Sequence, residues 1–405
     1  MNPETLVAIR SWVTDAGLTG MQENDLLRGF AERIRAAGTP INRAILVVDT
    51  LHPVHEGRAF RWRSDQKHES EIVEYGRSNA SEEDAANWRR SPFYQLLESG
   101  ETVLRRNMAR GDSPDFPVIE KMRNEGQTDY VVMVQRFTEA GTVGEMDCIY
   151  SAWSTDAPEG FLDGDVDSLV DLMPTLALAV KCASLFRIAG TLVETYLGRD
   201  AGKRVLDGRI ERGTADKVSA VLWWSDLRGF TGISDTAAPE QIMPMLNDYA
   251  EAIISSIHDE GGDVLKLIGD GILAVFEASD PARACQCALQ AATAARARIE
   301  AVNGRRSAQD LPITDAYLAL HFGDVFYGNI GSLERLDFTV IGPSVNMVNR
   351  IATMCRSAER KVLLSSNFVE AAPQHLHGDI VSVGRFALRG FADPQELFTI
   401  IPSAR

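Results

Sequence analysis

Two aspartates stand where apolar segments end, and together they could bind a divalent cation. Asp226 follows residues 218–225, which have the β-branched and aromatic composition of a buried strand, and Asp270 is the middle residue of a Gly-Asp-Gly turn between two further apolar runs. Burying a carboxylate without a partner is costly, whereas two carboxylates with phosphate oxygens suit Mg²⁺, which takes few protein ligands. Taken singly, Asp226 is also compatible with a capping role and Asp270 with an ordinary turn.

The segments around the two aspartates predict how the chain brings them together. A helix is predicted over residues 239–258, where apolar side chains recur at helical spacing: Ile242, Met245, Leu246, Tyr249, Ile253 and Ile257. A strand, this helix and the following hairpin would fold back on one another, so that Asp226 lies beside Asp270. Gly229, in the turn after the strand, lets the backbone approach a ligand, and neighbouring N–H groups could contact phosphate.

Three motifs in this half of the chain resemble those of the class III nucleotidyl cyclases. They are Ser-Asp-Leu-Arg-Gly-Phe-Thr at 225–231, Lys-Leu-Ile-Gly-Asp-Gly at 266–271, and the segment 338–350, which ends in Val-Asn-x-x-x-Arg. They occur in the order found in the family, and the resemblance covers about residues 200–400. It implies phosphoryl chemistry in which positioning and charge neutralisation do most of the work.

The resemblance assigns a metal and substrate role to the first two motifs. It implies that Asp226 and Asp270 hold two Mg²⁺ or Mn²⁺ ions per active site, one to activate the ribose 3′-hydroxyl and one to bind the triphosphate. Phe230 and Thr231, which follow in the first motif, are expected to contact the substrate. Arg389 is the candidate for a further phosphate-binding cation, at a place where the family usually has lysine.

The third motif supplies the expected catalytic pair, Asn346 and Arg350. The two residues are four apart in a predicted helix and therefore project from one face. By resemblance, Asn346 orients the ribose and Arg350 contacts phosphate in the transition state, where a planar guanidinium can spread the charge. Without the surrounding motif they would be ordinary polar residues on a helix surface.

The choice of purine base depends, by resemblance, on Lys266 and Thr339, each three residues before a motif glycine. A lysine ammonium only donates hydrogen bonds, which suits N1 of adenine, and a threonine hydroxyl can accept from the 6-amino group. This pair is similar to that of the adenylate cyclase branch that has threonine where other members have aspartate, a branch that includes bicarbonate-responsive enzymes. Without the motif, Lys266 would be an ordinary lysine on a surface strand.

We therefore expect an adenylate cyclase that converts ATP to 3′,5′-cyclic AMP and pyrophosphate. In this family the metal-binding and base-reading residues of one site come from different subunits, which implies a homodimer with two composite sites. The alternatives are a guanylate cyclase, or a catalytically silent protein of this fold that binds nucleotide and signals by interaction.

The predicted elements divide the chain into three parts. Residues 1–162 form an α+β regulatory domain whose order of helices, antiparallel strands and a long closing helix resembles GAF-type sensory domains. Residues 163–213 form a helical, dimer-forming connector, interrupted by Pro174 and Gly190, followed by a polar linker. Residues 214–405 are α+β, with a ferredoxin-like β-α-β-β-α-β core and additions.

Composition restricts the remaining possibilities. A formal net charge of −16 argues against general nucleic-acid binding. The sequence shows no uninterrupted apolar run near the roughly 20 residues that span a bilayer, so no membrane span is expected. The five cysteines lack metal-ligand spacing and are interpreted as reduced thiols of a cytoplasmic protein. The ligand or protein that regulates the N-terminal domain is not identified by its sequence.

Overall fold

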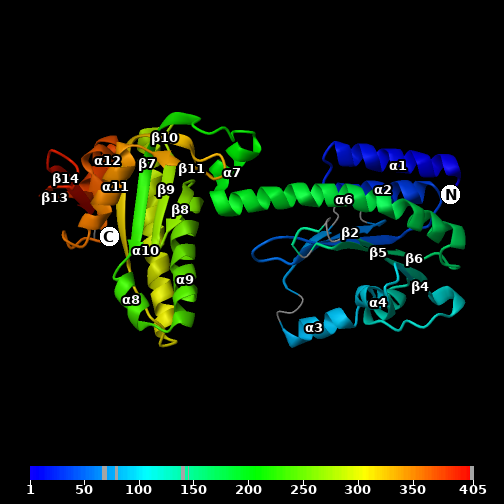
Figure 1. Ribbon diagram of the computed structural model, residues 1–405. Helices are drawn as coiled ribbons and strands as arrows, with labels where there is room; N and C mark the ends of the chain where they lie inside the picture. Colours follow the sequence, from blue (N-terminus) through cyan, green and yellow to red (C-terminus); the bar gives the residue numbers. More distant parts are fainter. Residues whose placement is uncertain (66–70, 78–80, 138–141, 145, 402–405) are drawn as a thin grey trace. The chain divides into compact units, whose positions relative to one another are not determined.

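The chain folds into two compact units, Met1–Leu192 and Val193–Arg405 (Figure 1). The computed structural model describes residues 1–65, 71–77, 81–137, 142–144 and 146–401. The boundary between the units falls inside the segment expected to be a connector, near the end of one long helix, α6 (Asp163–Leu197).

The first unit is built on a six-stranded antiparallel sheet with the order β3-β2-β1-β6-β5-β4. The strands are β1 (Arg43–Asp49), β2 (Gly57–Arg63), β3 (Glu71–Tyr75), β4 (Val103–Asn107), β5 (Asp129–Arg136) and β6 (Cys148–Thr155). The helices are α1 (Pro3–Leu18), α2 (Glu23–Ala36), α3 (Glu82–Arg89), α4 (Pro92–Ser99), α5 (Pro117–Asn124) and α6, with a 3-10 turn at Met108–Arg110. The predicted antiparallel sheet is confirmed, whereas β4, α3 and α5 were missed because each is short and largely polar.

Both faces of this sheet are covered by helices. Along β1, alternate residues enter two separate clusters of buried side chains. Ala44, Leu46 and Val48 pack with apolar residues of α1, α2 and α6, whereas Ile45 and Val47 pack against a cluster that includes residues of α4 and α5. The strand period of two thus fixes which side chains meet which helical layer.

Helix α6 runs without a break through Pro174 and Gly190, so the predicted interruption was wrong. Pro174 cannot donate the helical hydrogen bond to the carbonyl of Val170, but both residues are exposed, so water can satisfy that carbonyl. By length and composition α6 could also cross a membrane, although 33% of its most apolar stretch is buried in the protein. Core helices of globular proteins pass the same test, so this is weak evidence for a span.

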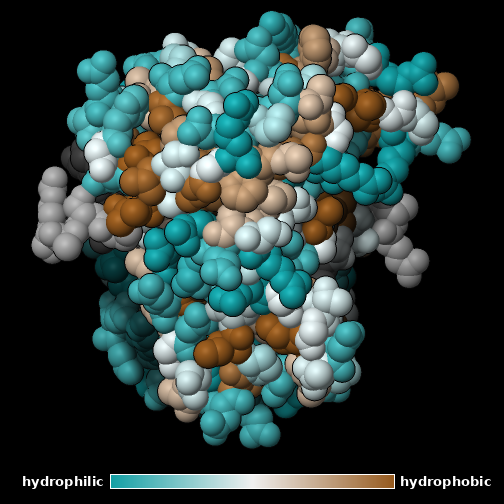
Figure 2. All heavy atoms as spheres, turned by 90° about the vertical axis from the view of Figure 1, so that its left-hand side faces the viewer, coloured by the Kyte–Doolittle hydropathy of each residue, from teal (hydrophilic) through white to brown (hydrophobic). Residues whose placement is uncertain are grey.

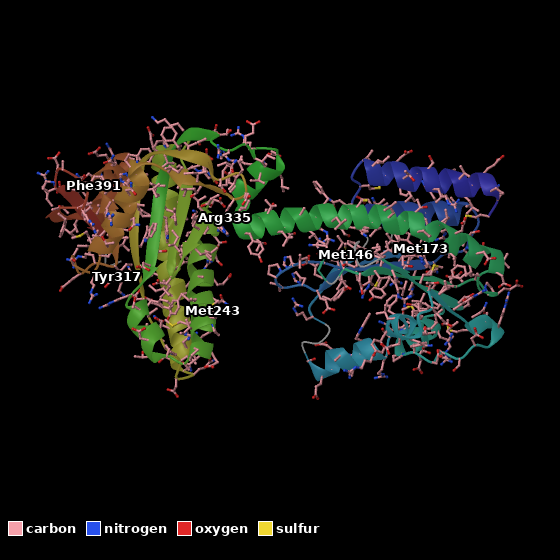
Figure 3. All side chains as sticks on the ribbon, in the orientation of Figure 1. Met146, Met173, Met243, Tyr317, Arg335 and Phe391 are labelled. Carbon is pink, nitrogen blue, oxygen red and sulfur yellow. The ribbon has the colours of Figure 1, made fainter. Side chains whose placement is uncertain are left out.

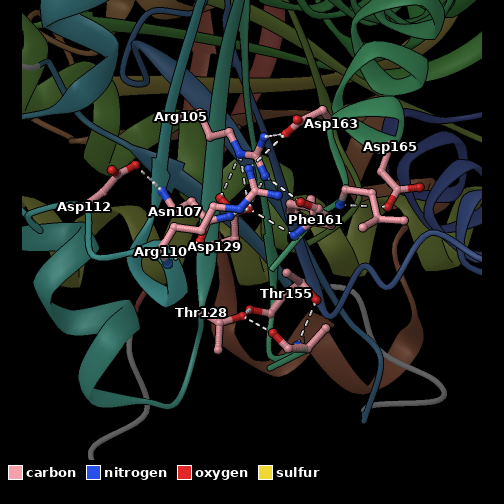
Figure 4. A network of polar contacts seen from close by, with 12 residues as sticks. Arg105, Asn107, Arg110, Asp112, Thr128, Asp129, Thr155, Phe161, Asp163 and Asp165 are labelled. Atoms are coloured by element: carbon pink, nitrogen blue, oxygen red, sulfur yellow. Dashed lines mark hydrogen bonds and ion pairs between the residues drawn. The ribbon is translucent and has the colours of Figure 1, made fainter. Parts of the chain in front are cut away.

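A buried carboxylate fastens the start of α6 to the sheet (Figure 4). The side chain of Asp129, at the beginning of β5, is fully buried and accepts from Arg105 Nη2 (2.7 Å), Asn107 Nδ2 (3.0 Å) and the N–H of Phe161 (3.0 Å). Arg105 also donates to the Phe161 carbonyl (2.6 Å) and to Asp163 (2.8 Å), the first residue of α6. The network therefore joins two strands to the segment that leads into the long helix.

Replacing Asp129 by asparagine should lower the free energy of unfolding by about 3 kcal/mol, because the Arg105 guanidinium loses its buried counter-charge. Asp163→Asn is the matched control: it removes a carboxylate that is 74% exposed from the same arginine and should lower the free energy of unfolding much less. Urea unfolding of both variants measures the difference. Equal, small effects would contradict the structural role assigned to Asp129.

The second unit contains an eight-stranded sheet with the order β13-β14-β12-β10-β7-β9-β8, and β11 pairs with β10. The strands are β7 (Ala215–Leu227), β8 (Asp263–Ile268), β9 (Gly271–Glu277), β10 (Ala316–Gly331), β11 (Leu336–Ile341), β12 (Val362–Ser365), β13 (Ile380–Phe386) and β14 (Gln395–Ile400). The helices are α7 (Arg199–Leu206), α8 (Phe230–Thr236), α9 (Pro239–Asp259), α10 (Pro281–Ser307), α11 (Pro343–Met354) and α12 (Ser366–Ala371), with a 3-10 turn at Gln374–Asp379.

The predicted ferredoxin-like core is present. The elements β7, α9, β8, β9, α10 and β10 follow the order β-α-β-β-α-β, and their strands lie in the order β10-β7-β9-β8, all antiparallel. Helices α9 and α10 pack together, and their apolar stripes share one buried cluster with β7 and β9. This arrangement places the end of β7 next to the β8–β9 turn.

Two features of this unit differ from what its sequence indicates. Gly323-Asp324 is typical of a turn between two strands, but β10 continues through it because its pairing with β7 is unbroken there: Gly323 lies opposite Ala220 and Asp324 opposite Ser219. The expected polar linker contains helix α7, whose first N–H group is bound by Asp263 at the start of β8 (3.0 Å). Long-range contacts of this kind outweigh local sequence preferences.

Candidate active site

The paired strands bring Asp226 and Asp270 together, as predicted. Asp226 is the penultimate residue of β7, where Ser225 lies opposite Ile272 of β9, and Asp270 occupies the turn that precedes β9. Gly269 adopts φ 65°, a conformation that glycine tolerates best, and so allows the tight turn. The backbone N–H of Leu227 donates to Asp270 Oδ2 (3.3 Å), which fixes the second carboxylate beside the first.

The surroundings of Asp226, including Asp270, change its ionisation. Burial, a hydrogen bond with Asp270 and the negative charge of Asp270 together raise the pKa of Asp226 to about 6. Two adjacent carboxylates in a partly desolvated place resist being charged together. A bound cation would remove that repulsion, so the donor set fits a divalent metal ion.

Only two carboxylates meet here; no group of three or more His, Cys, Asp or Glu side chains suited to a metal occurs among the residues that the structure describes. An ion bound at this point would therefore need further oxygen ligands from water or from a substrate. Mg²⁺ commonly binds in this way, through one or two carboxylates plus phosphate oxygens.

A pocket of about 640 Å³ opens in front of the two aspartates. Besides Asp226 and Asp270, the first motif contributes Phe230 and Thr231, at the start of α8, together with Gly229 and Gly232. Gly229 adopts φ 69°, so the backbone turns sharply after β7 and continues along the pocket wall. The structure thus gathers four of the sequence-predicted residues into one cavity.

The same pocket contains polar residues that the sequence analysis missed. They are Tyr317, Asn349, Thr353 and Arg356. Tyr317 is on β10, directly opposite Asp226 of β7, and is labelled in Figure 3. The three others follow one another at four- and three-residue steps along and just beyond α11, and this helical spacing was the available signal.

Lys266 and Thr339 lie in a second group of polar residues. Lys266 of β8 is ion-paired with Asp337 of β11, and Thr339 is two residues further along β11 on the same face. Thr339 is only 7% exposed, so its hydroxyl is in a largely desolvated place. The structure therefore places the two predicted base-reading residues on neighbouring strands, with an aspartate between them that the sequence analysis did not consider.

Asn346, Arg350 and Arg389 do not line the pocket of the two aspartates. Asn346 is exposed and Arg350 half-buried on α11, and within the described part of the chain neither side chain makes a hydrogen bond or ion pair. Arg389 is exposed in the turn after β13, where Gly390 adopts φ 90°. The expected catalytic pair and the expected metal site are thus on separate parts of one unit.

Asp270→Asn should stabilise the metal-free protein at pH 7. The substitution removes the charge that opposes Asp226, while the amide oxygen can still accept from Leu227. Because the pKa of Asp226 is raised, the folded protein holds more protons than the unfolded chain between about pH 4 and 6, so stability is lost as pH rises through that window. We expect the melting temperature at pH 7 to rise by about 2–4 °C, the shift for a gain of roughly 1 kcal/mol.

Thermal unfolding in the presence of a chelator measures this effect. The difference between Asp270→Asn and the parent should shrink as the pH falls toward about 4. Asp207→Asn, at an exposed site away from the pocket, should change the melting temperature little. An Asp270→Asn variant that melts at or below the parent temperature at pH 7 would show that the two carboxyl groups do not repel each other.

Comparison with known proteins identifies the family of the second unit. Residues 211–401 match the family model of the adenylate and guanylate cyclase catalytic domain. This segment of the chain therefore belongs to the class III nucleotidyl cyclase family, as its three motifs had indicated.

Several named proteins are similar to the second unit. An adenylate cyclase of Anabaena cylindrica is 32% identical over 164 residues, which are 40% of this chain and 32% of that protein. Adenylate cyclase 1 of Rhizobium meliloti (strain 1021) is 28% identical over 172 residues, 41% of this chain and 25% of that protein. The chain thus spans a third or less of the length of these relatives. Among solved structures, the adenylyl cyclase CyaB from P. aeruginosa is 23% identical, with a TM-score of 0.43, over 47% of this chain and 98% of that chain.

Proposed function

We propose that the chain is an adenylate cyclase that forms 3′,5′-cyclic AMP and pyrophosphate from ATP. The observation that carries this proposal is the meeting of Asp226 and Asp270 at one end of the ferredoxin-like sheet, in a pocket large enough for a triphosphate. The similarity of the second unit to proteins named adenylate cyclases supports it.

In this proposal Asp226 and Asp270 hold two Mg²⁺ or Mn²⁺ ions per site. When bound, the ions neutralise triphosphate charge and lower the pKa of the ribose 3′-hydroxyl. Phe230 and Thr231, on the pocket wall, contact the substrate beside the carboxylates. The chain's own contribution is to orient the ribose and the triphosphate for in-line attack on the α-phosphorus.

Lys266 and Thr339 would select adenine. The ammonium donates to N1, and the hydroxyl accepts from the 6-amino group while being itself held in a desolvated place. For Lys266 to act in this way it must share its three donors between Asp337 and the base, and an ammonium has enough N–H groups for both. Asp337 thus sets the direction from which the lysine approaches the base.

Each site would be completed by a second copy of the chain. Asn346 and Arg350, whose side chains make no hydrogen bond or ion pair with the described residues, would then meet the substrate held by the partner's aspartates, with Asn346 on the ribose and Arg350 on the phosphate. Arg389 would add positive charge at the triphosphate. A homodimer arranged in this way has two equivalent sites, and a single chain has none.

Exposed apolar side chains support such a dimer. They occur at the β8–β9 hairpin and along the β10–β11 arm, the elements that carry Lys266 and Thr339: Leu267, Ile268, Phe326, Ile330, Leu333, Leu336 and Ile341. Leu267 is 60% exposed and Leu333 88%. Figure 2 shows apolar side chains exposed between polar ones on the face of the second unit that it presents. Clusters of exposed apolar residues are typical of protein–protein contacts.

The first unit would be a GAF-like regulatory domain, and α6 its connection to the catalytic unit. The six-stranded antiparallel sheet between two helical layers supports this assignment. The five free cysteines are in keeping with a cytoplasmic protein.

Purified protein should show a higher kcat/KM with ATP than with GTP, and this preference should depend on Lys266. In Lys266→Ala the activity with ATP should fall at least tenfold, roughly the contribution of a hydrogen bond to a charged group, while the ATP-to-GTP ratio moves toward one. Arg298→Ala is the control, because Arg298 also pairs with an aspartate (Asp259), but this pair joins helices α10 and α9 instead of strands β8 and β11. A preference for GTP would refute the adenylate assignment, and an unchanged ratio in Lys266→Ala would refute the role of that lysine.

A further inference from the structure

A cavity of about 310 Å³ lies in the first unit between the sheet and helix α5. Its floor is made by β1, β2, β5 and β6, and one wall is made by α5 and the residue that ends it, Glu125. A cavity of this volume is at the lower end of those that hold small organic ligands.

The strand register gathers arginines on the floor of this cavity. Arg43 of β1 lies directly opposite Arg63 of β2, and Ile45 lies opposite Arg61. Residues directly opposite each other in an antiparallel pair share one face, so the three guanidinium groups are neighbours. Like charges in such positions destabilise a sheet unless an anion lies between them.

The charges around the cavity are not balanced. Its cations are Arg43, Arg61, Arg63 and Lys121. Arg61 lies opposite Glu71 in the register of β2 and β3. Among the described residues, the other three cations pair with two carboxylates: Glu125, which contacts Arg43 and Lys121, and Asp65, which contacts Arg63. Three positive groups thus share two negative ones, in a protein whose net charge is −16. This local excess is opposite in sign to the rest of the chain and favours an anionic ligand.

One N–H donor of Arg43 has no partner among the described residues. Its side chain is 18% exposed, and its Nη1 contacts Glu125 and lies 3.6 Å from Met122 Sδ. Its Nε, in contrast, is buried and has no hydrogen-bond partner among the described residues. A buried N–H without a partner costs about 1–3 kcal/mol, and an oxygen of a bound anion would satisfy it. Guanidinium groups bind carboxylate and phosphate oxygens particularly well.

Apolar side chains complete the cavity. Ile45 and Ala152 lie beside the arginines on the sheet, Val118 and Met122 face them from α5, and Tyr130 is 6% exposed. A small inorganic anion would leave this apolar surface uncovered. The lining therefore fits an anion that carries an apolar group about the size of an aromatic ring.

We propose that this cavity is a binding site for a small organic anion, a carboxylate or a phosphate monoester on an apolar body. The site deepens the regulatory role proposed for the first unit, but its existence does not depend on cyclase activity. Tyr130, which lines the cavity, directly follows Asp129 in β5. The carboxylate of Asp129 holds the segment that enters α6. A ligand that shifts β5 would thus act on the anchor of the long helix.

Isothermal titration of the full chain with matched probes tests the proposal. Phenylacetate, indole-3-acetate and phenyl phosphate are the anions, and phenylacetamide and 2-phenylethylamine present the same ring as phenylacetate without a negative charge. We expect at least one anion to bind saturably with Kd at or below about 1 mM, and the amide and the amine to bind at least tenfold more weakly. Comparing the affinity for the two carboxylates with that for phenyl phosphate then shows which kind of anion the site prefers.

Variants locate the bound probe. Arg43→Gln should weaken binding at least tenfold, and Arg63→Gln, at a more exposed position, provides the same test if Arg43→Gln fails to fold. Arg28→Gln on α2 is the control, since Arg28 pairs with Asp25 on the opposite side of the sheet, and it should bind as the parent does. The proposal is overturned if no anion saturates by about 10 mM, if the amide binds as tightly as the acid, if both cavity variants bind normally, or if excess ATP displaces the probe.

Because binding is measured without turnover, the outcome is independent of the proposed reaction. A chain that binds the anions but makes no cyclic nucleotide would leave this site intact and refute the enzyme. A chain that makes cyclic AMP but binds none of the anions would support the enzyme and refute this site.

Discussion

Asp226→Ala should reduce cyclic AMP formation about a thousandfold or more. The substitution leaves Asp270 as the only carboxylate among the described residues that line the pocket, so the divalent ions proposed for the reaction would no longer be held against the triphosphate. The variant should nevertheless be folded, because it also removes one of two carboxyl groups that repel each other. Product formation at saturating Mg²⁺ and ATP, measured beside thermal unfolding, separates loss of chemistry from loss of structure.

Asp235→Ala is the matched control for this prediction. Asp235 is an exposed carboxylate on α8, a few residues beyond the pocket wall formed by Phe230 and Thr231. Its loss should change the activity less than about twofold. An Asp226→Ala protein that keeps more than about a tenth of the parent activity would exclude this carboxylate as a metal ligand.

A dimer that pairs an Asp226→Ala chain with an Arg350→Ala chain should recover about half of the parent activity. Each variant alone should be inactive, because every composite site of its homodimer lacks one essential group. In the mixed dimer one site carries both substitutions and the other carries none, so one of the two sites works. Coexpression of the two chains with different tags, followed by purification on both, gives the mixed dimer for assay.

The control pairs two substitutions from the same half of the site. A mixed dimer of Asp226→Ala and Asp270→Ala chains has one defective aspartate in each site and should stay inactive. Recovery in this control, or none in the Asp226–Arg350 pair, would mean that the aspartates and Arg350 do not come from different chains.

The meeting of the two aspartates could be predicted from the sequence because it depends on local patterns. A buried strand ending in Asp226 and a hairpin with Asp270 at its tip need only the neighbouring strand pairing to bring their carboxyl groups together, and this pairing follows from the β-α-β-β-α-β order. The same holds for the helix 239–258, whose apolar spacing predicted α9 to within a residue at either end.

Contacts between distant segments could not be predicted in this way. Tyr317 reaches the pocket only because β10 pairs with β7 in a register that places it opposite Asp226. Likewise, the ion pair of Lys266 with Asp337 depends on how β11 lies against β8. The continuity of β10 through Gly323 and Asp324 depends on its pairing with β7, a strand about a hundred residues earlier in the chain. In each case the decisive neighbour is set by tertiary packing.

In the first unit, too, local patterns could be predicted from the sequence and contacts between distant segments could not. The apolar run at residues 44–48 is typical of a strand, but the cluster of arginines on its face arises from the register with β2, which no local pattern reveals. The helix α6 was expected to break at Pro174, and it continues because that residue is exposed to solvent. Whether a proline is exposed depends on how the helix packs, which the residues next to it in the sequence do not determine.

The most direct test of the proposed reaction is the product made from ATP by the purified full-length chain with Mg²⁺ or Mn²⁺. The structure and motifs together predict cyclic AMP and pyrophosphate in equal amounts, with the reaction stopped by a chelator and restored by added metal. Protein that binds ATP but forms no cyclic AMP with either metal, or that forms only cyclic GMP from GTP, would contradict the proposal that this chain is an adenylate cyclase.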